Sequence, residues 1–289
     1  MFTILEGMRP RQWLKNLFVF AGLLFTLDVD HPASDFLRVG LAFGLFCMLS
    51  GSIYLLNDIL DAERDRKHEE KRRRPIASGR LSKPAAWGAF WVIAPAAVVA
   101  SFTLGREFGA MALAYTVIFG LYSVRLKEVV ILDVMLIASG FVLRAAAGAA
   151  AVQVVISPWL LICTTLLALL LGLAKRREEL LVLEVEAANH RPSLDHYTVP
   201  FVDQMIGISA SATIISYALY TFFSATGQQH PHLMATVPFV IYGIFRYLFL
   251  IQHRLGVESP ELLVVRDRPL LINILLWIIT SAVIVGLGR

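Results

Sequence analysis

The sequence predicts an all-α membrane protein with nine transmembrane helices. Of the 289 residues, 57% are hydrophobic and only 17% are charged, whereas soluble domains average about 45–50% and 25%. The mean hydropathy of +0.67 describes the whole chain, so the apolar excess is not confined to one anchor. At about 30 residues for each helix and its connection, the chain has room for eight or nine bilayer crossings. These observations argue against a water-soluble fold.

The expected spans are the stretches that lack Asp, Glu, Lys and Arg. They are Asn16–Leu27, Val39–Asn57, Pro84–Gly105, Phe108–Val124, Val134–Leu143 continuing past Arg144, Ala145–Ala174 with a break near Ser157-Pro158, two helices within Gln204–Phe245, and Pro269–Gly288. The turn between the two helices of Gln204–Phe245 is expected from Gly227 to His232. Because the first span is short for a core of about 30 Å, it either begins near Trp13 with Lys15 reaching the interface or lies tilted.

The distribution of Lys and Arg predicts a cytoplasmic N-terminus and an external C-terminus. When the connections are assigned alternately to the two sides, all but four of the 26 basic residues fall on the side of the N-terminus. The exceptions are Arg38, Arg106 and Arg289 on the other side, and Arg144 inside a helix. An excess of basic residues marks the cytoplasmic face. The net charge of +4 therefore reports topology and not nucleic-acid binding.

Polar residues concentrate in two long cytoplasmic connections, at about residues 58–83 and 175–203. Connections of this length in a compact bundle are usually functional. We expect residues 1–289 to form a single intramembrane domain in which these two loops make the polar cap of a site. Both cysteines lie in apolar runs and the histidines are scattered, which argues against disulfides and against a zinc site.

The connection 58–83 begins with a cluster of acidic residues. On a helix, four side chains with oxygen donors fall within an arc of about 100°: Asn57, Asp58, Asp61 and Asp65. Stacked carboxylates repel one another unless a cation joins them, and oxygen-only ligands suit a hard ion, Mg²⁺ or Mn²⁺, that also binds phosphate oxygens. The alternative is a solvated helix end, or one that pairs with Arg64, Arg66 and Lys67.

A basic run, Lys71-Arg72-Arg73-Arg74-Pro75, follows the acidic cluster at once. A metal with basic residues around it is what a diphosphate needs, because the metal bridges its oxygens and Arg or Lys neutralises the rest. Together the two motifs indicate a diphosphate site. Taken by itself, the basic run is equally well explained as a topogenic or lipid-headgroup patch.

Arg144 is expected about ten residues into the fifth helix, where an unpaired cation is costly, so it should face the bundle interior. Asp133 projects from nearly the same side of that helix but lies some 16 Å away. The two residues could line one polar cavity; alternatively, Arg144 caps backbone carbonyls of a broken helix. Tyr122 and Lys127 end the fourth helix, a pattern that is also ordinary at membrane interfaces.

With these residues in place, the chain resembles the UbiA superfamily of intramembrane prenyltransferases. The resemblance rests on the Asn57-Asp58-x-x-Asp61-x-x-x-Asp65 signature, the Tyr122-to-Lys127 element and the nine-helix plan. Within the superfamily, the chain is more similar to the decaprenyl-phosphate phosphoribosyltransferase branch. The segments that carry this similarity are Arg9–Asn16, Tyr54–Asp58, Lys71–Gly79, Leu143–Gly148, Lys175–Leu180, Arg191–Tyr197, Arg246-Tyr247 and Arg266–Arg268.

One departure separates the chain from family members that act on aromatic acceptors. The resemblance implies that those enzymes carry a second Asp-rich motif in the loop after the sixth helix, which binds the second metal of a prenyl diphosphate. Here that loop offers only Asp195 and Asp203. The donor is therefore expected to differ from a prenyl diphosphate.

The resemblance implies transfer of 5-phosphoribose from phosphoribosyl diphosphate (PRPP) to a polyprenyl phosphate of the decaprenyl type, with release of diphosphate. Asp58, Asp61, Asn57 and Lys15 would be catalytic, and Mg²⁺ or Mn²⁺ would be held by Asn57, Asp58, Asp61 and Asp65. The implied substrate-binding residues are Arg74, Tyr122, Lys127, Arg144, Lys175, Arg176, Glu179, Arg191 and Tyr197. The enzyme would lie in a bacterial-type inner membrane with its site on the cytoplasmic side, and a homo-oligomer is compatible with the sequence.

Two other functions fit parts of the pattern. The first is a UbiA-type prenyltransferase that moves a prenyl chain from prenyl diphosphate to an aromatic or other acceptor. The second is a transporter or a lipid-binding membrane protein, whose polar residues should be distributed through the spans to make a pathway. Because most ionisable residues here collect on one side of the membrane, the pattern favours an enzyme.

Overall fold

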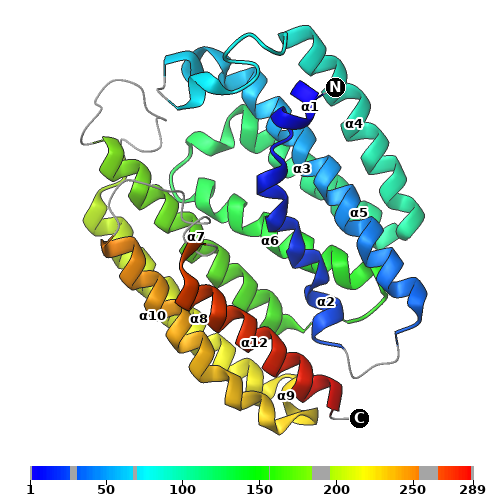
Figure 1. Cartoon of the computed structure of the whole chain (residues 1–289), viewed down its shortest axis with the longest axis vertical. Helices are drawn as coiled ribbons and strands as arrows, with labels where there is room; N and C mark the ends of the chain where they lie inside the picture. Colours follow the sequence, from blue (N-terminus) through cyan, green and yellow to red (C-terminus); the bar gives the residue numbers. More distant parts are fainter. Residues whose placement is uncertain are drawn as a thin grey trace. The chain divides into compact units, whose positions relative to one another are not determined.

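The computed structural model describes residues 2–26, 31–67, 70–155, 157–183, 196–253 and 266–287. These residues form helices and no strand, which confirms the all-α class (Figure 1). Eight helical segments are long and apolar enough to cross a membrane. They are built on α3 (Ala33–Lys67), α4 (Lys83–Ser101), α5 (Arg106–Val124), α6 (Leu132–Ala151), α7 (Pro158–Leu183), α8 (Val199–Phe223), α10 (Val237–His253) and α12 (Arg268–Leu287).

The first predicted span, Asn16–Leu27, is built differently from the other spans. The chain forms the short helix α1 (Phe2–Gly7), then the 3₁₀ helix η1 (Pro10–Phe20) and the four-residue helix α2 (Ala21–Leu24). A 3₁₀ run of 11 residues is unusually long, because its hydrogen-bond geometry is poorer than that of an α-helix. The described residues therefore contain eight candidate crossings by length and composition, where the sequence predicts nine.

Other boundaries agree with the sequence in outline. The predicted break near Ser157-Pro158 lies between the end of α6 and the start of α7. The turn between α8 and α10 contains α9 (Ala225–Gln229) and the 3₁₀ helix η6 (Pro231–Thr236). The largest difference is in α3, which continues ten residues past the predicted end at Asn57. This extension keeps the acidic cluster on a helix.

The structure divides into two compact units, one made of Met1–Gly22 and Pro32–Val155 and the other of Leu23–His31 and Ile156–Arg289. In the first unit, α3 packs against α1, η1, α4, α5 and α6. Its core includes Phe46, whose ring meets the rings of Phe108 and Tyr115 edge-on at 5.8 and 5.4 Å. Because α3 contacts every other long helix of this unit, residues at its end have fixed neighbours.

Helix α6 and the segment η1–α2 approach closely because glycines line their contact. A Cβ added to Gly148 would lie 1.9 Å from the carbonyl oxygen of Val19, and one added to Gly22 would lie 2.9 Å from the Cα of Ala149. Small residues are the usual means by which membrane helices bring their backbones together. The position of η1 on α6 therefore depends on these two glycines.

The second unit is held by helix pairs: α7 packs against α8, α8 against α10, and α10 against α12. Its core gathers Phe25, Cys163, Tyr217, Tyr220, Leu233 and Val285. Helix α8 begins at a capping threonine, because the Thr198 side chain accepts a hydrogen bond from the amide of Phe201. In the core, the Trp277 indole donates to the Tyr217 hydroxyl at 2.8 Å.

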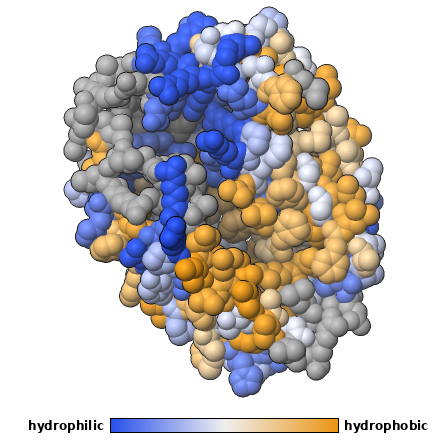
Figure 2. Space-filling view, in the orientation of Figure 1, coloured by the Kyte–Doolittle hydropathy of each residue, from blue (hydrophilic) through white to orange (hydrophobic). Residues whose placement is uncertain are grey.

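Charged and polar side chains of the first unit gather at one of its ends. In the space-filling view, hydrophilic residues lie where α3 ends and the α3–α4 connection begins, whereas hydrophobic residues predominate on the rest of the visible face of this unit (Figure 2). The 3₁₀ helix η2 (Lys71–Arg73) lies in that connection. The end of α3 is therefore the part of this unit in which a polar site can form.

Replacing Gly148 with alanine should weaken the packing of η1 on α6, because the backbone of η1 must move to admit the methyl group. Overpacking of this kind costs about 1–3 kcal/mol, so the apparent unfolding midpoint in detergent should fall by about 2–10 °C in a thermal-unfolding assay. Gly44→Ala is the matched control, since nothing lies within 4 Å of a Cβ there. A wild-type midpoint for Gly148→Ala would contradict this contact.

Candidate active site

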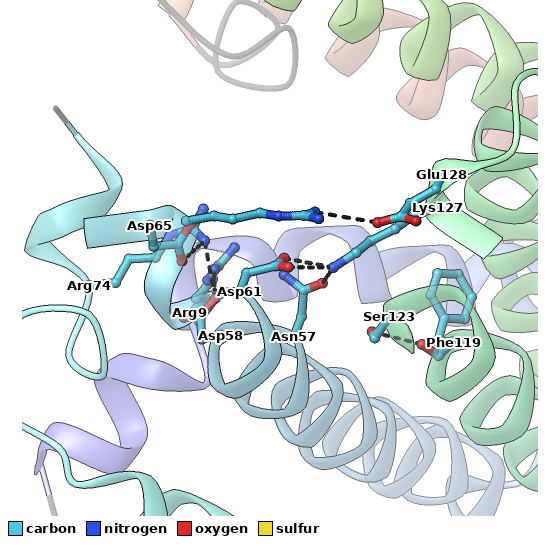
Figure 3. Close-up of polar contacts among 11 residues, drawn as sticks. Arg9, Asn57, Asp58, Asp61, Asp65, Arg74, Phe119, Ser123, Lys127 and Glu128 are labelled. Atoms are coloured by element: carbon cyan, nitrogen blue, oxygen red, sulfur yellow. Dashed lines mark hydrogen bonds and ion pairs between the residues drawn. The ribbon is translucent and has the colours of Figure 1, made fainter. Parts of the chain in front are cut away.

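The last turns of α3 bring four oxygen-bearing side chains to the polar end of the first unit (Figure 3). Asp58 and Asp65 are buried, at 1% and 4% exposure, while Asn57 and Asp61 are half-buried. Carboxylates in such places require cationic or hydrogen-bonding partners, because burial penalises an isolated charge heavily. The partners come from three separate segments of the chain.

Arg74 joins two of the carboxylates. Its Nη1 lies 2.7 Å from Asp65 Oδ2 and 3.2 Å from Asp58 Oδ1. The residue immediately follows η2, whose Arg72 and Arg73 are exposed. The predicted basic run is therefore divided: Arg74 turns toward the acids of α3, and the two arginines before it face outward.

Arg9 is a second cation at Asp58, and the sequence analysis gave it no individual role in the site. Its Nη2 donates to Asp58 Oδ1 across 49 positions of sequence. Its backbone has a φ of 54°, in the left-handed region that non-glycine residues rarely adopt. Burial lowers the pKa of the Arg9 guanidinium, and the Asp58 carboxylate partly counteracts this shift. The only sequence signal was its place in the basic segment Arg9–Asn16.

Lys127 is the third cation, and it is only 2% exposed. Its Nζ lies 2.7 and 2.8 Å from the two oxygens of Asp61 and 3.2 Å from Asn57 Oδ1. The lysine comes from the 3₁₀ helix η4 (Leu126–Glu128), which follows α5. Tyr122, near the end of α5, is half-buried, and its ring centroid lies 6.0 Å from that of Phe119. The predicted Tyr122-to-Lys127 element thus supplies its lysine to the acidic face of α3.

The donor set fits a hard divalent cation that binds together with phosphate. Asp58 Oδ2 is buried and accepts no hydrogen bond from the described residues. Within the same residues, no three His, Cys, Asp or Glu side chains form a group able to hold a metal by themselves. Mg²⁺ commonly takes one or two carboxylates and completes its coordination with water and substrate phosphates. These residues fit that open kind of site better than a closed protein cage.

Arg144 lies in a different environment from the acidic cluster. It is buried on α6 and donates to Asn16 Oδ1, the Gly140 carbonyl and the Tyr115 hydroxyl. Helix α6 is continuous through this residue, so the alternative in which Arg144 caps a broken helix is wrong. Asp133, with which it was expected to share a cavity, is also buried. Lys15 is half-buried on η1 beside Asn16.

The remaining predicted site residues belong to the second unit, and Arg191 lies outside the described residues. Arg176 is 1% exposed and pairs with Glu179 one helical turn later on α7, while Lys175 is half-buried on the same helix. Tyr197 is buried just before α8. Sequence reasoning did not anticipate two ion pairs of this unit: Arg177 with Asp203 at 2.6 Å, and Arg246 with Asp267 at 2.9 Å.

Comparison with known proteins places the chain in a family. Residues 16–265 match the model of the UbiA prenyltransferase family. A decaprenyl-phosphate phosphoribosyltransferase from Mycolicibacterium smegmatis is 33% identical over 95% of this chain and 90% of its own length. One from Mycobacterium tuberculosis is 30% identical over 99% of this chain and 95% of its own length.

The fold is also shared with a solved structure. A UbiA homologue from Archaeoglobus fulgidus, bound to GPP and Mg²⁺, has a TM-score of 0.75 and covers 98% of this chain and 99% of its own. At 17% sequence identity, this likeness shows the fold alone. The family match and the two near-full-length relatives show that the chain belongs to the UbiA prenyltransferase family.

Proposed function

We propose that this protein is an intramembrane transferase that moves 5-phosphoribose from PRPP to a polyprenyl phosphate of the decaprenyl type and releases diphosphate. The observation that carries the proposal is the cluster at the end of α3, where three carboxylates lie against Arg9, Arg74 and Lys127. The near-full-length similarity to relatives named decaprenyl-phosphate phosphoribosyltransferase supports the identity of donor and acceptor.

The cations of the cluster are suited to phosphate groups. Donor and acceptor both carry phosphates, and their negative charges must be brought together at the edge of a low-dielectric membrane. Arg74 and Lys127 are already partly desolvated, so their charges are weakly screened and act strongly on a nearby phosphate. We assign Arg9, Arg74, Lys127 and Lys15 to neutralising the diphosphate and the 5-phosphate.

The carboxylates of α3 are suited to the metal that accompanies a diphosphate. Asp58 and Asp61, with Asp65 and Asn57, would hold Mg²⁺, and Mn²⁺ prefers the same oxygen donors. When bound, the metal supplies positive charge to the departing diphosphate. The chain itself would orient the donor, because each carboxylate of the cluster has a cation beside it.

The acceptor needs no catalytic base. The second pKa of a phosphate monoester is about 6, so the lipid phosphate is largely ionised near neutral pH. Bond breaking at C1 of the ribose gives that carbon oxocarbenium character, as in glycoside chemistry. What the protein must provide is charge and orientation. The roles assigned from the sequence to Tyr122, Lys175, Arg176, Glu179, Arg191 and Tyr197 stay predictions.

We further propose nine crossings, with the end of α3 on the cytoplasmic side of a bacterial inner membrane. Rising about 2.0 Å per residue, η1 followed by α2 extends about 28 Å, close to the hydrocarbon thickness of about 30 Å. A 3₁₀ segment thus crosses the core with fewer residues than an α-helix needs. The one-sided distribution of Lys and Arg supports this orientation.

The proposed activity predicts that label from PRPP enters a lipid. Full-length protein in detergent, supplied with a polyprenyl phosphate, Mg²⁺ and PRPP radiolabelled in the ribose, should yield labelled material that extracts into organic solvent. Omission of the lipid phosphate should abolish this signal. If instead a labelled prenyl chain is transferred to an aromatic acid and no ribose label reaches the lipid, the protein is a prenyltransferase and the proposal is wrong.

The metal assignment predicts that Asp61→Asn loses turnover. Loss of one charged group that acts on the reacting diphosphate should lower kcat by about 10²–10³-fold, and Asn57→Ala should act in the same direction. Glu63→Gln is the matched control, because Glu63 stands two residues later on α3, is exposed, and pairs with Arg66 and Lys83. A chelator should stop the wild type and Mg²⁺ should restore it. Full activity in Asp61→Asn would refute the assignment.

The proposed topology predicts opposite locations for the two ends of the chain. A cysteine placed at Arg289 should react with a membrane-impermeant maleimide on intact cells, and one placed at the exposed Phe2 near the N-terminus should react only after permeabilisation. The native Cys47 and Cys163 are both buried and give a low background. Eight crossings would put both ends on one side, so the same response to permeabilisation at the Phe2 and Arg289 positions would overturn the nine-crossing arrangement.

A further inference from the structure

Arg144 on α6 is a buried arginine whose observed hydrogen-bond acceptors are all uncharged. It is 4% exposed. Its Nε donates to Asn16 Oδ1 at 2.7 Å, its Nη1 to the Gly140 carbonyl at 2.8 Å and its Nη2 to the Tyr115 hydroxyl at 2.8 Å. The guanidinium also lies over the Tyr115 ring, 4.8 Å from its centroid. All three nitrogens of the side chain are thus directed at protein groups.

Asn16 extends this network to another helix. Its side chain is completely buried, and Nδ2 donates to Ser50 Oγ at 3.2 Å and contacts Cys47 Sγ at 3.3 Å. Ser50 and Cys47 belong to α3. Arg144 and Asn16 therefore connect η1, α3, α5 and α6 through one set of polar contacts. Polar groups at membrane depth are costly unless they find partners of this kind.

The segment that Asn16 belongs to carries cations of the proposed site. Arg9 is the residue immediately before η1 and contacts Asp58, and Lys15 precedes Asn16 within η1. A 3₁₀ helix of this length is not stable by its own hydrogen bonds, so external contacts must fix its position. Gly148 allows close approach to α6 but gives no directional bond, whereas the Asn16–Arg144 hydrogen bond is directional.

We propose that Arg144 is a positioning residue: by holding Asn16, it fixes η1 in the register that places Arg9 against Asp58 and sets the depth of Lys15. This role replaces the substrate contact predicted for Arg144 from the sequence, because each of its three nitrogens already donates a hydrogen bond to Asn16, Gly140 or Tyr115. The roles of Arg9 and Lys15 toward phosphates rest on the proposed function. The positioning of η1 by Arg144 is independent of that function.

The kinetics of four variants test how the loss of the Asn16–Arg144 contact affects the proposed active site. Asn16→Ala and Arg144→Met should each lower kcat by about 10- to 100-fold, the loss expected when reacting groups shift by about 1 Å, with little change in the KM for PRPP. The double variant should be no worse than either single variant, since both break one link. Asn16→Asp keeps an acceptor for Arg144 and adds an opposite charge, so it should retain most of the wild-type kcat.

A distance measurement tests the placement without any activity. Nitroxide labels on Arg11→Cys, exposed on η1, and Lys67→Cys, exposed at the end of α3, report the separation of the two segments by pulsed electron resonance on full-length protein in nanodiscs. The distribution should be narrow in the wild-type and Asn16→Asp backgrounds. It should broaden or shift in Asn16→Ala and Arg144→Met.

Asn273→Ala is the matched control, because it removes a different buried asparagine that donates to the Phe239 carbonyl at 2.9 Å in the second unit. It should leave both kcat and the label distances unchanged. Label distances that stay at wild type in Asn16→Ala and Arg144→Met would overturn the positioning role, as would a raised KM for PRPP in Arg144→Met alone. The label distances do not depend on which group the protein transfers. They therefore test whether Arg144 positions η1 even if the proposed function is wrong.

Discussion

The ion pair between Lys127 and Asp61 is the contact on which the polar end of the first unit depends. Lys127 is almost fully buried, and both oxygens of Asp61 lie within hydrogen-bonding distance of its Nζ. A buried ammonium group is tolerated only when paired, so η4 must stay against α3. That requirement fixes the connection between α5 and α6, and it places a cation between Asp61 and Asn57. Arg9 and Arg74 act in the same way at Asp58, one from the residue before η1 and the other from the residue after η2.

A second constraint operates in the interior of the first unit, where η1 must be held against its neighbours. Glycines at positions 22 and 148 let the backbones approach, and Asn16 gives the segment one directional bond to Arg144. The glycine contacts bring η1 against α6 but give it no hydrogen bond to that helix. The Asn16–Arg144 pair supplies one. The two constraints are linked through Arg9, which immediately precedes η1 and contacts the acids of α3.

The sequence predicted the parts of the site that local geometry determines. Asp58, Asp61 and Asp65 share a face because helical periodicity alone sets their directions, and that inference needed only the assumption that the helix continues past Asn57. Arg9 was given no role because its contact with Asp58 spans 49 positions and needs a left-handed backbone that no residue type at that site signals. Asn16 was read as the start of an apolar span, since a 3₁₀ segment and an α-helix have similar hydrophobic patterns over a few turns. Two of the acceptors of Arg144, on Asn16 and Tyr115, likewise come from other elements far away in the chain.

The composition of the cluster bears on which ligand it favours. Three carboxylates and three cations lie around one helix end, so the site as a whole is close to neutral. A free divalent cation meets carboxylates that already have Arg or Lys beside them, and a free diphosphate meets cations that already have carboxylates beside them. A metal–diphosphate complex presents both charges at once: the carboxylates would hold the metal, and the guanidinium and ammonium groups would neutralise the phosphates. Because both charges find a partner, the site favours binding of the metal–diphosphate complex over binding of the free metal or the free diphosphate. This preference agrees with a donor whose leaving group is a diphosphate.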